Sequence, residues 1–243
     1  MSRQNTYNRS IKCFNEPHTP EELDRMVADK TINRGKFLNK RHAGSYQEQI
    51  KTILRLGIER VLEIGPGEGY TARNLNALGL QFDTLDFEGA HKPTIQADFN
   101  TFDPKPYSGK YELCCGFQVL EHFPFEDFPR LVDKMVTMSS RYVYLSVPYS
   151  CYGFHFELGM HTGQLPFSKR LRFYMPSYKK NRKYREGFMK EFPWAVHYWE
   201  IGRKGFPLKR INKTIEACGL KILEQNHGPN PFHYYFLCEK IGE

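Results

Sequence analysis

Residues 61–70 read VLEIGPGEGY, an apolar run that contains the acid Glu63 and leads into three glycines at alternate positions, Gly65, Gly67 and Gly69. The apolar run predicts a buried strand, and the residues after the glycines predict a helix. Glycine lets the chain turn sharply and lets a ligand approach the backbone closely. A helix N-terminus behind such a loop favours anions and polar groups. The stretch therefore predicts a ligand-binding turn between a strand and a helix.

Spacing excludes two phosphate-binding motifs for this loop. A dinucleotide fingerprint, GxGxxG, requires glycine where Tyr70 stands, and a P-loop requires Gly-Lys-Ser/Thr, which is absent. Glu63 would repel a pyrophosphate, whereas it could hold a cationic or amino-bearing ligand. The alternative is a tight turn without a ligand, which needs fewer glycines and no acid.

Strand-like and helix-like segments alternate on both sides of this turn. The pattern predicts strands at 60–64, 81–86, 94–97, 111–117 and 141–147, with helices at 70–78 and 127–138. A helix ending at Gly219 and two further strands, 220–225 and 232–238, follow a break in the pattern. Such alternation predicts an α/β fold, a doubly wound and mostly parallel sheet, here closed by a C-terminal antiparallel hairpin.

The same pattern predicts that the chain is divided into three structural parts. Residues 1–58 form an N-terminal helical cap, residues 59–148 and 204–243 form the sheet domain, and residues 149–203 form an inserted lid. The insertion is rich in aromatic and basic residues, and we expect it to contain little regular strand. Its segment 165–190 holds nine Lys or Arg residues and one acid, which accounts for the whole net charge of +8. The partner of that segment is therefore expected to be anionic.

Residues 63–69, EIGPGEG, resemble motif I, E/D-x-G-x-G-x-G, of the class I S-adenosylmethionine-dependent methyltransferases. Residues 119–122, VLEH, resemble a signature of the methyltransferase-11-type subgroup. The resemblance covers about half of the chain, 59–148 and 205–240. It implies a Rossmann-like seven-stranded sheet with S-adenosylmethionine as cofactor and S-adenosylhomocysteine as product.

The resemblance also implies the residues that hold the cofactor. Asp86, at the end of the second strand, corresponds to the acid that binds the ribose hydroxyls. Asp98 corresponds to the acid that meets the adenine amino group, although it could instead cap a turn. Phe87 and Phe99 either flank the adenine or belong to the core, and Gln118 faces the methionine end. The expected cofactor-binding set is Glu63, Gly65, Gly67, Gly69, Asp86, Phe87, Asp98, Phe99 and Gln118.

Methyl transfer requires alignment of the acceptor with the methyl group and exclusion of water, and a general base is optional. The candidate catalytic residues are His122, His155 and Glu157, which follow predicted strands on the ligand side of such a sheet. A role for His122 in orienting its loop is an equal alternative. His197 and Glu200 are three residues apart and could face one way, or belong to a buried aromatic cluster. We expect no metal, because the segment offers few carboxylates.

The expected acceptor is a small or glycan-like molecule, anionic and methylated on oxygen. An RNA methyltransferase is the alternative enzyme, because cations interleaved with aromatics suit RNA. An inactive cofactor-binding partner subunit is a third reading. No apolar run is long enough to span a membrane, and the N-terminus lacks a signal peptide. We therefore expect a cytoplasmic protein whose six cysteines are reduced thiols.

Overall fold

The computed structural model describes residues 40–67, 69–89, 92–162, 165–183 and 196–242. Its main sheet has seven strands in the order β3-β2-β1-β4-β5-β9-β8. The first five strands pair in parallel, and β9 runs antiparallel to both β5 and β8. The strands are β1 (Arg60–Ile64), β2 (Gln81–Asp86), β3 (Ile95–Gln96), β4 (Tyr111–Phe117), β5 (Ser139–Pro148), β8 (Leu220–His227) and β9 (His233–Lys240). The predicted doubly wound sheet and its closing hairpin are confirmed.

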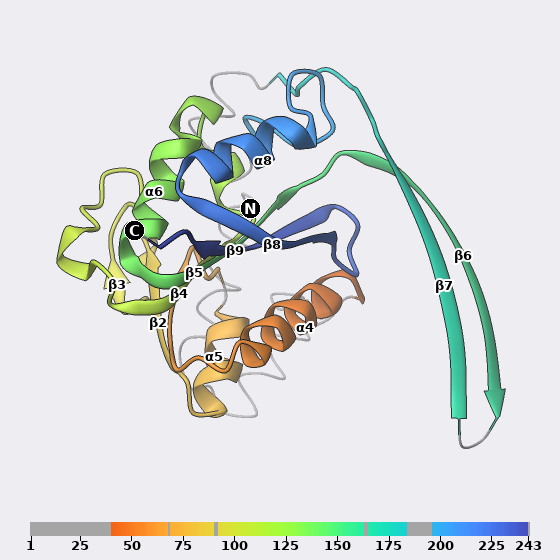
Figure 1. Cartoon of the computed structure of the whole chain (residues 1–243), viewed down its shortest axis with the longest axis horizontal. Helices are drawn as coiled ribbons and strands as arrows, with labels where there is room; N and C mark the ends of the chain where they lie inside the picture. The colour runs from red at the N-terminus through yellow and green to blue at the C-terminus, as the bar shows by residue number, and fades with distance from the viewer. Residues whose placement is uncertain (1–39, 68, 90–91, 163–164, 184–195, 243) are drawn as a thin grey trace, which may run out of the picture.

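Helices cover both faces of this sheet (Figure 1). On one face lie α4 (Lys40–Arg55) and α5 (Tyr70–Ala77), and on the other lie α6 (Phe128–Met138) and α8 (Leu208–Ala217). Neighbouring residues of β1 pack into two different core clusters. Val61 belongs to the cluster that contains Leu75 of α5, and Leu62 belongs to the cluster that contains residues of α6 and α8. A parallel strand buried on both faces reads as a continuous apolar run. The run in residues 61–64 is therefore explained by its central position.

Polar side chains hold α4 against the sheet. Gln49 is buried and accepts a hydrogen bond of 2.6 Å from the Thr71 hydroxyl of α5. Ser45 is also buried, and its hydroxyl lies 3.0 Å from Nδ1 of His233 on β9. This helix thus belongs to the helical layer of the sheet. The rest of the expected cap at 1–58 includes residues 1–39, which lie outside the described residues.

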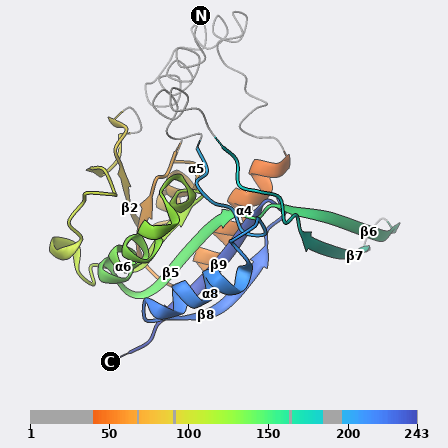
Figure 2. The ribbon, with the colours of Figure 1, turned by 90° about the horizontal axis from the view of Figure 1, so that it is seen from above.

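The expectation of little regular strand in the insertion is wrong. Strands β6 (Cys151–Thr162) and β7 (Leu165–Pro176) form an antiparallel hairpin of 12 residues each. Both views show this hairpin leaving the body of the protein as an arm (Figures 1 and 2). The sequence pattern is explained by the alternation of a strand, because large apolar residues occupy every second position and glycine or charged residues the others. We call residues 151–176 the arm.

Three short 3₁₀ turns complete the described fold: η2 (Lys105–Tyr107), η3 (Leu120–His122) and η4 (Phe125–Asp127). The last two follow the end of β4 and lead into α6. Among the described residues, no helix combines the length and the apolar character needed to cross a membrane.

Candidate active site

The glycine loop joins β1 to α5 with a left-handed backbone at each glycine. The φ angles are 62° at Gly65, 55° at Gly67 and 64° at Gly69, a region that side chains disfavour. A Cβ on Gly65 would lie 2.7 Å from Cγ2 of Val119, so no side chain fits there. A Cβ on Gly67 would meet nothing within 4 Å, so the loop faces open space at this position. Gly69 is the N-cap of α5.

Glu63 lies on β1 below this loop and is buried. Its Oε2 has no hydrogen-bond partner among the described residues. Burial, together with the nearby Asp86 carboxylate, raises the pKa of Glu63 to about 8. A buried carboxyl without a partner is costly, and a cationic or N–H group of a ligand would satisfy it. The residue thus fits the amino-bearing end of S-adenosylmethionine.

Asp86 ends β2 at the same edge of the sheet as the glycine loop. The Gly65 amide donates to the carbonyl of Leu85 at 2.8 Å, which ties the loop to the end of β2. Asp86 is buried, and its Oδ1 accepts a hydrogen bond of 3.0 Å from the Glu88 amide. Phe87 follows it and is 62% exposed. An acid and an exposed aromatic ring beside a glycine loop suit a ribose and an adenine, respectively.

Asp98 and Phe99 have local structural roles in this fold. Asp98 is exposed, and its Oδ1 accepts a 2.8 Å hydrogen bond from the amide of Asn100, as in a capped turn. Phe99 is buried in the core cluster under α6. The turn cap and the core position are the alternatives that the sequence left open for these two residues. A contact of either residue with the adenine remains a prediction.

Gln118 lies just past the end of β4 in a left-handed conformation, with a φ of 59°. Its amide donates to the Ser146 carbonyl at 2.9 Å, and its side-chain Nε2 donates to the Ser146 hydroxyl at 3.2 Å. These two bonds to β5 hold a conformation that non-glycine residues rarely adopt. The predicted cofactor-binding residues Glu63, Gly65, Asp86 and Gln118 therefore all come from the carboxyl ends of β1, β2 and β4, the ligand side of such sheets.

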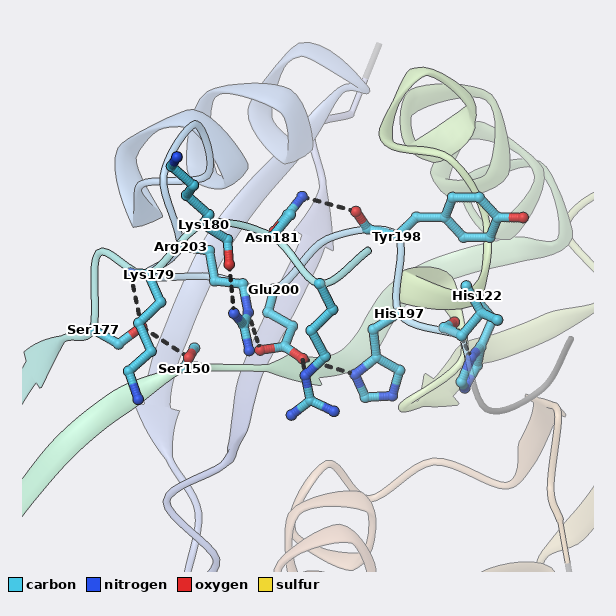
Figure 3. Close-up of polar contacts among 12 residues, drawn as sticks. His122, Ser150, Ser177, Lys179, Lys180, Asn181, His197, Tyr198, Glu200 and Arg203 are labelled. Carbon is cyan, nitrogen blue, oxygen red and sulfur yellow. Dashed lines mark hydrogen bonds and ion pairs between the residues drawn. The ribbon is translucent and has the colours of Figure 1, made fainter. Parts of the chain in front are cut away.

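His122 follows Gln118 by four residues, and Figure 3 shows it beside His197. Nδ1 of His122 lies 2.8 Å from the carbonyl of Val196, so the imidazole donates this proton to the backbone. Its ring packs edge-on against His197, with 5.2 Å between the centroids. Burial lowers the pKa of His122 to about 4, and the neighbouring His197 adds to this effect, so the ring is neutral at physiological pH. Its position at the sheet edge is the one expected from the sequence.

His197 connects this ring to a buried ion pair. Its Nδ1 is 3.2 Å from Oε1 of Glu200, and Nε of Arg203 donates to Oε2 of the same carboxylate. Burial alone would raise the pKa of Glu200, but the hydrogen bonds from His197 and Arg203 outweigh it and lower the pKa. Nε of Arg182 lies 3.6 Å from Oε1, with its side chain 55% exposed. Glu200 is thus an anion that orients one histidine and two arginines.

Residues 177–183 and residues 196–203 are joined by further bonds to the backbone. Arg203 also donates from its second nitrogen, Nη1, to the carbonyl of Lys180 at 2.8 Å, and Asn181 donates to the carbonyl of Tyr198 at 2.9 Å. Sequence reasoning missed Arg182 and Arg203 as part of the site. The Glu200-x-x-Arg203 spacing was a usable signal, because residues three apart can meet on one turn.

One set of side chains has the composition of a metal site. The ligand atoms of Glu121, His122 and His197 lie within 4.8 Å of one another. Glu121 is fully buried, and its carboxylate oxygens lack partners among the described residues. Burial, together with the nearby Glu200, raises the pKa of Glu121 to about 8. We assign no metal to this set, since two bonds of about 2.1 Å to one ion hold their ligand atoms at most about 4.2 Å apart, and these atoms are spread over up to 4.8 Å.

His155 and Glu157 lie on the arm and are not brought together with the ends of the sheet strands. Both side chains are exposed, in register with Arg172 and Arg170 of β7. In both views the arm extends away from the body of the protein (Figures 1 and 2). Of the three catalytic candidates, His122 alone is placed beside the candidate cofactor residues.

The fold and the placement of these residues define a Rossmann-like methyltransferase architecture. Solved structures with this fold include the 1,6-didemethyltoxoflavin-N1-methyltransferase of Burkholderia thailandensis, 13% identical over 93% of this chain and 92% of that chain, with a TM-score of 0.52. The magnesium protoporphyrin IX methyltransferase of Synechocystis PCC 6803 is 13% identical over 97% and 93%, with a TM-score of 0.55. The DhpI–SAH complex is 14% identical over 100% of both chains, with a TM-score of 0.52.

A family model described as a methyltransferase domain matches residues 21–225, which is most of the chain. The chain therefore belongs to this methyltransferase family, and it is an S-adenosylmethionine-dependent methyltransferase. No curated protein matches the sequence. The resemblance noted on residues 63–69 and 119–122 is confirmed at the level of the family.

Proposed function

We propose that this methyltransferase methylates an oxygen of a small anionic acceptor, such as a glycan precursor. The observation that carries the proposal is the Arg182–Glu200–His197 chain, which joins a group of exposed cations to the ring that packs against His122. Lys179, Lys180, Arg182 and Lys183 are all exposed. Buried Arg203 also pairs with Glu200, so Arg182 is not the sole counterion of this carboxylate, and an anionic acceptor can bind Arg182 together with the neighbouring lysines. Arg suits phosphate and carboxylate groups through its planar fork.

The cofactor supplies an electrophilic methyl group carried on a sulfonium. In the proposal, Glu63 accepts a hydrogen bond from the amino group of the cofactor, and the glycine loop lets the cofactor approach the backbone. Asp86 accepts the ribose hydroxyls, and Gln118 lies beside the methionine end. Phe87, Asp98 and Phe99 remain candidates for the adenine. Asp86→Ala would weaken S-adenosylhomocysteine binding in calorimetry if the ribose assignment is correct.

His122 is the residue proposed to act on the acceptor. Donation of Nδ1–H to the Val196 carbonyl selects the tautomer in which Nε2 is the basic nitrogen. A hydroxyl acceptor then has one histidine to receive its proton, and His197 is oriented beside it by Glu200. The two residues on the arm, His155 and Glu157, have no comparable support.

The distribution of charge on the arm favours a small acceptor over RNA. Phe173 and Arg172 are adjacent in sequence, so in a strand they face opposite sides. An RNA platform needs aromatic rings and cations on one surface. Two structural neighbours are methyltransferases named for small molecules, 1,6-didemethyltoxoflavin and magnesium protoporphyrin IX.

The experiment is methylation of phosphorylated and carboxylated sugars by the wild type and by R182A/K180A, with K221A on β8 as the matched exposed-cation control. We expect KM for an anionic acceptor to rise about tenfold in R182A/K180A, with little change in kcat or in KM for a neutral analogue. K221A should behave as the wild type. Methylation of polyribonucleotide and of no sugar would overturn the proposal in favour of an RNA enzyme. Tight cofactor binding without product from any acceptor would favour an inactive partner subunit.

A further inference from the structure

The arm presents one continuous apolar face to solvent. Because side chains alternate across a strand, every second residue of β6 meets every second residue of β7 on the same side. The cross-strand pairs on this side include Phe154 with Phe173 and Phe156 with Leu171. The exposed large apolar side chains of the face are Tyr152, Phe154, Phe156, Leu158, Leu171, Phe173 and Met175, between 49% and 65% exposed.

The opposite face of the arm is polar and is braced at its base. His155 and Arg172 are paired there, one rung from Phe154 and Phe173. Nearer the body, the ring of Tyr174 covers Gly153 and packs against the His227 ring of β8, with 4.0 Å between centroids. The base is thus held by the body, while the apolar face remains uncovered.

The exposed area is too large for an ordinary monomer surface. A fully exposed side chain of this size presents roughly 200 Å², so the seven exposed fractions leave about 800 Å² uncovered. The largest apolar patch on a typical monomer is about 300–600 Å². A standard protein interface buries about 800 Å² on each partner. The face therefore has the area of one complete side of an interface.

We propose that the arm is a dimerisation arm, and that the apolar faces of two arms pack against each other about a two-fold axis. Such an interface uses the same surface on both copies, which a single apolar face provides. His155, Glu157 and Arg172 then point outward, so no like charges are buried between the copies. Lys169, in register with Leu158 towards the tip, can extend its ammonium to the rim.

The arm fits a second copy better than a lipid bilayer. The outer edges of β6 and β7 carry backbone N–H and C=O groups that this two-stranded sheet leaves unpaired. Hydrocarbon would leave these groups unsatisfied at a high cost, whereas face-to-face packing of two arms leaves them in water. A two-stranded hairpin is also marginally stable alone, and burial of its apolar face would stabilise it.

The test is the molar mass of the full chain, measured by sedimentation equilibrium and light scattering. We expect the wild type at twice 28.6 kDa. F154S/F173S should raise the dimer dissociation constant at least about a hundredfold, since two central aromatics are removed. H155S/R172S changes the neighbouring rung on the opposite face and should remain dimeric. Circular dichroism and S-adenosylhomocysteine binding check the fold of each variant.

A second variant guards against misfolding of the first. The Ser150 and Ser177 hydroxyls lie 2.9 Å apart at the base of the arm, so a short turn can replace residues 151–176. This variant should be a folded monomer. A monomeric wild type at micromolar concentration, or a dimer that survives both arm variants, would overturn the proposal. A monomer that cosediments with anionic phospholipid vesicles through Phe154 and Phe173 would also overturn it, in favour of a membrane surface.

Discussion

Nδ1 of His197 is hydrogen-bonded to the carboxylate of Glu200 at 3.2 Å, and the same carboxylate is buried against Arg203. The ring of His197 also packs against His122, and this second contact joins the 196–203 segment to the turn after β4. This candidate site is therefore assembled from two segments whose histidines are 75 residues apart. Four predictions follow from the geometry of the two halves of the site.

Removal of either partner of the buried Glu200–Arg203 pair should destabilise the protein. Arg203→Met leaves the Glu200 carboxylate buried with less compensation, and we expect a loss of about 3 kcal/mol or more in the free energy of unfolding. Urea unfolding measures this loss. The double variant E200Q/R203M should be more stable than R203M, because it no longer buries an uncompensated charge. Additive losses in the double variant would contradict the pairing.

Glu63 should make cofactor binding depend on pH. Its pKa of about 8 means that the free enzyme holds this proton at neutral pH, and a cationic amino group of the ligand favours its release. Binding is then coupled to proton loss, so affinity should fall as the pH drops below 8, by up to about tenfold per unit.

Calorimetry with S-adenosylhomocysteine between pH 6 and 9 tests this coupling. Glu63→Gln should bind more weakly at pH 8, and its affinity should depend less steeply on pH below 8. The ionisation of the ligand affects both proteins equally. Identical slopes for the two proteins would rule out a role for the Glu63 proton.

Gly65 and Gly57 form a matched pair, since each has a φ of 62° but only Gly65 is crowded. Alanine at either position costs about 1 kcal/mol through the backbone conformation. At Gly65 the new methyl group also collides with Val119 and displaces the loop. We expect G65A to weaken S-adenosylhomocysteine binding at least about tenfold and G57A to leave it unchanged. Equal binding by the two variants would show that the glycine loop does not contribute to cofactor binding.

His122→Asn should lower kcat and spare cofactor binding. Loss of a general base typically costs 10²–10⁴-fold in rate, and Asn can keep the donor to the Val196 carbonyl. Steady-state kinetics with a hydroxyl acceptor, together with calorimetry for S-adenosylhomocysteine, measure the two effects. An equal loss of kcat in His155→Asn would indicate that His155 acts in catalysis, despite its exposed position on β6. Unchanged kcat in H122N would assign His122 to loop structure alone.

Much of the fold was predictable because its signals are local. Strands β1, β2 and β4 have the predicted bounds, since a central parallel strand is an apolar run bounded by turn residues. The arm was misread because its glycines and charges suggested an irregular loop. The alternation of Phe154, Phe156 and Leu158 with glycine and polar residues was a usable strand signal in the sequence, and the pairing with β7 then shows one continuous apolar face.

The sequence by itself determined the glycine turn, the order of strands and helices in the seven-stranded sheet, and the motifs that resemble the family, because glycine spacing and apolar periodicity depend on neighbours along the chain. Only the tertiary structure decided which of the three candidate catalytic residues lies near the predicted cofactor-binding residues. It also decided that His197, held by Glu200, packs against His122, and that Phe99 is core. Those outcomes depend on contacts between distant segments, and burial in a folded core sets the pKa values of Glu63 and His122.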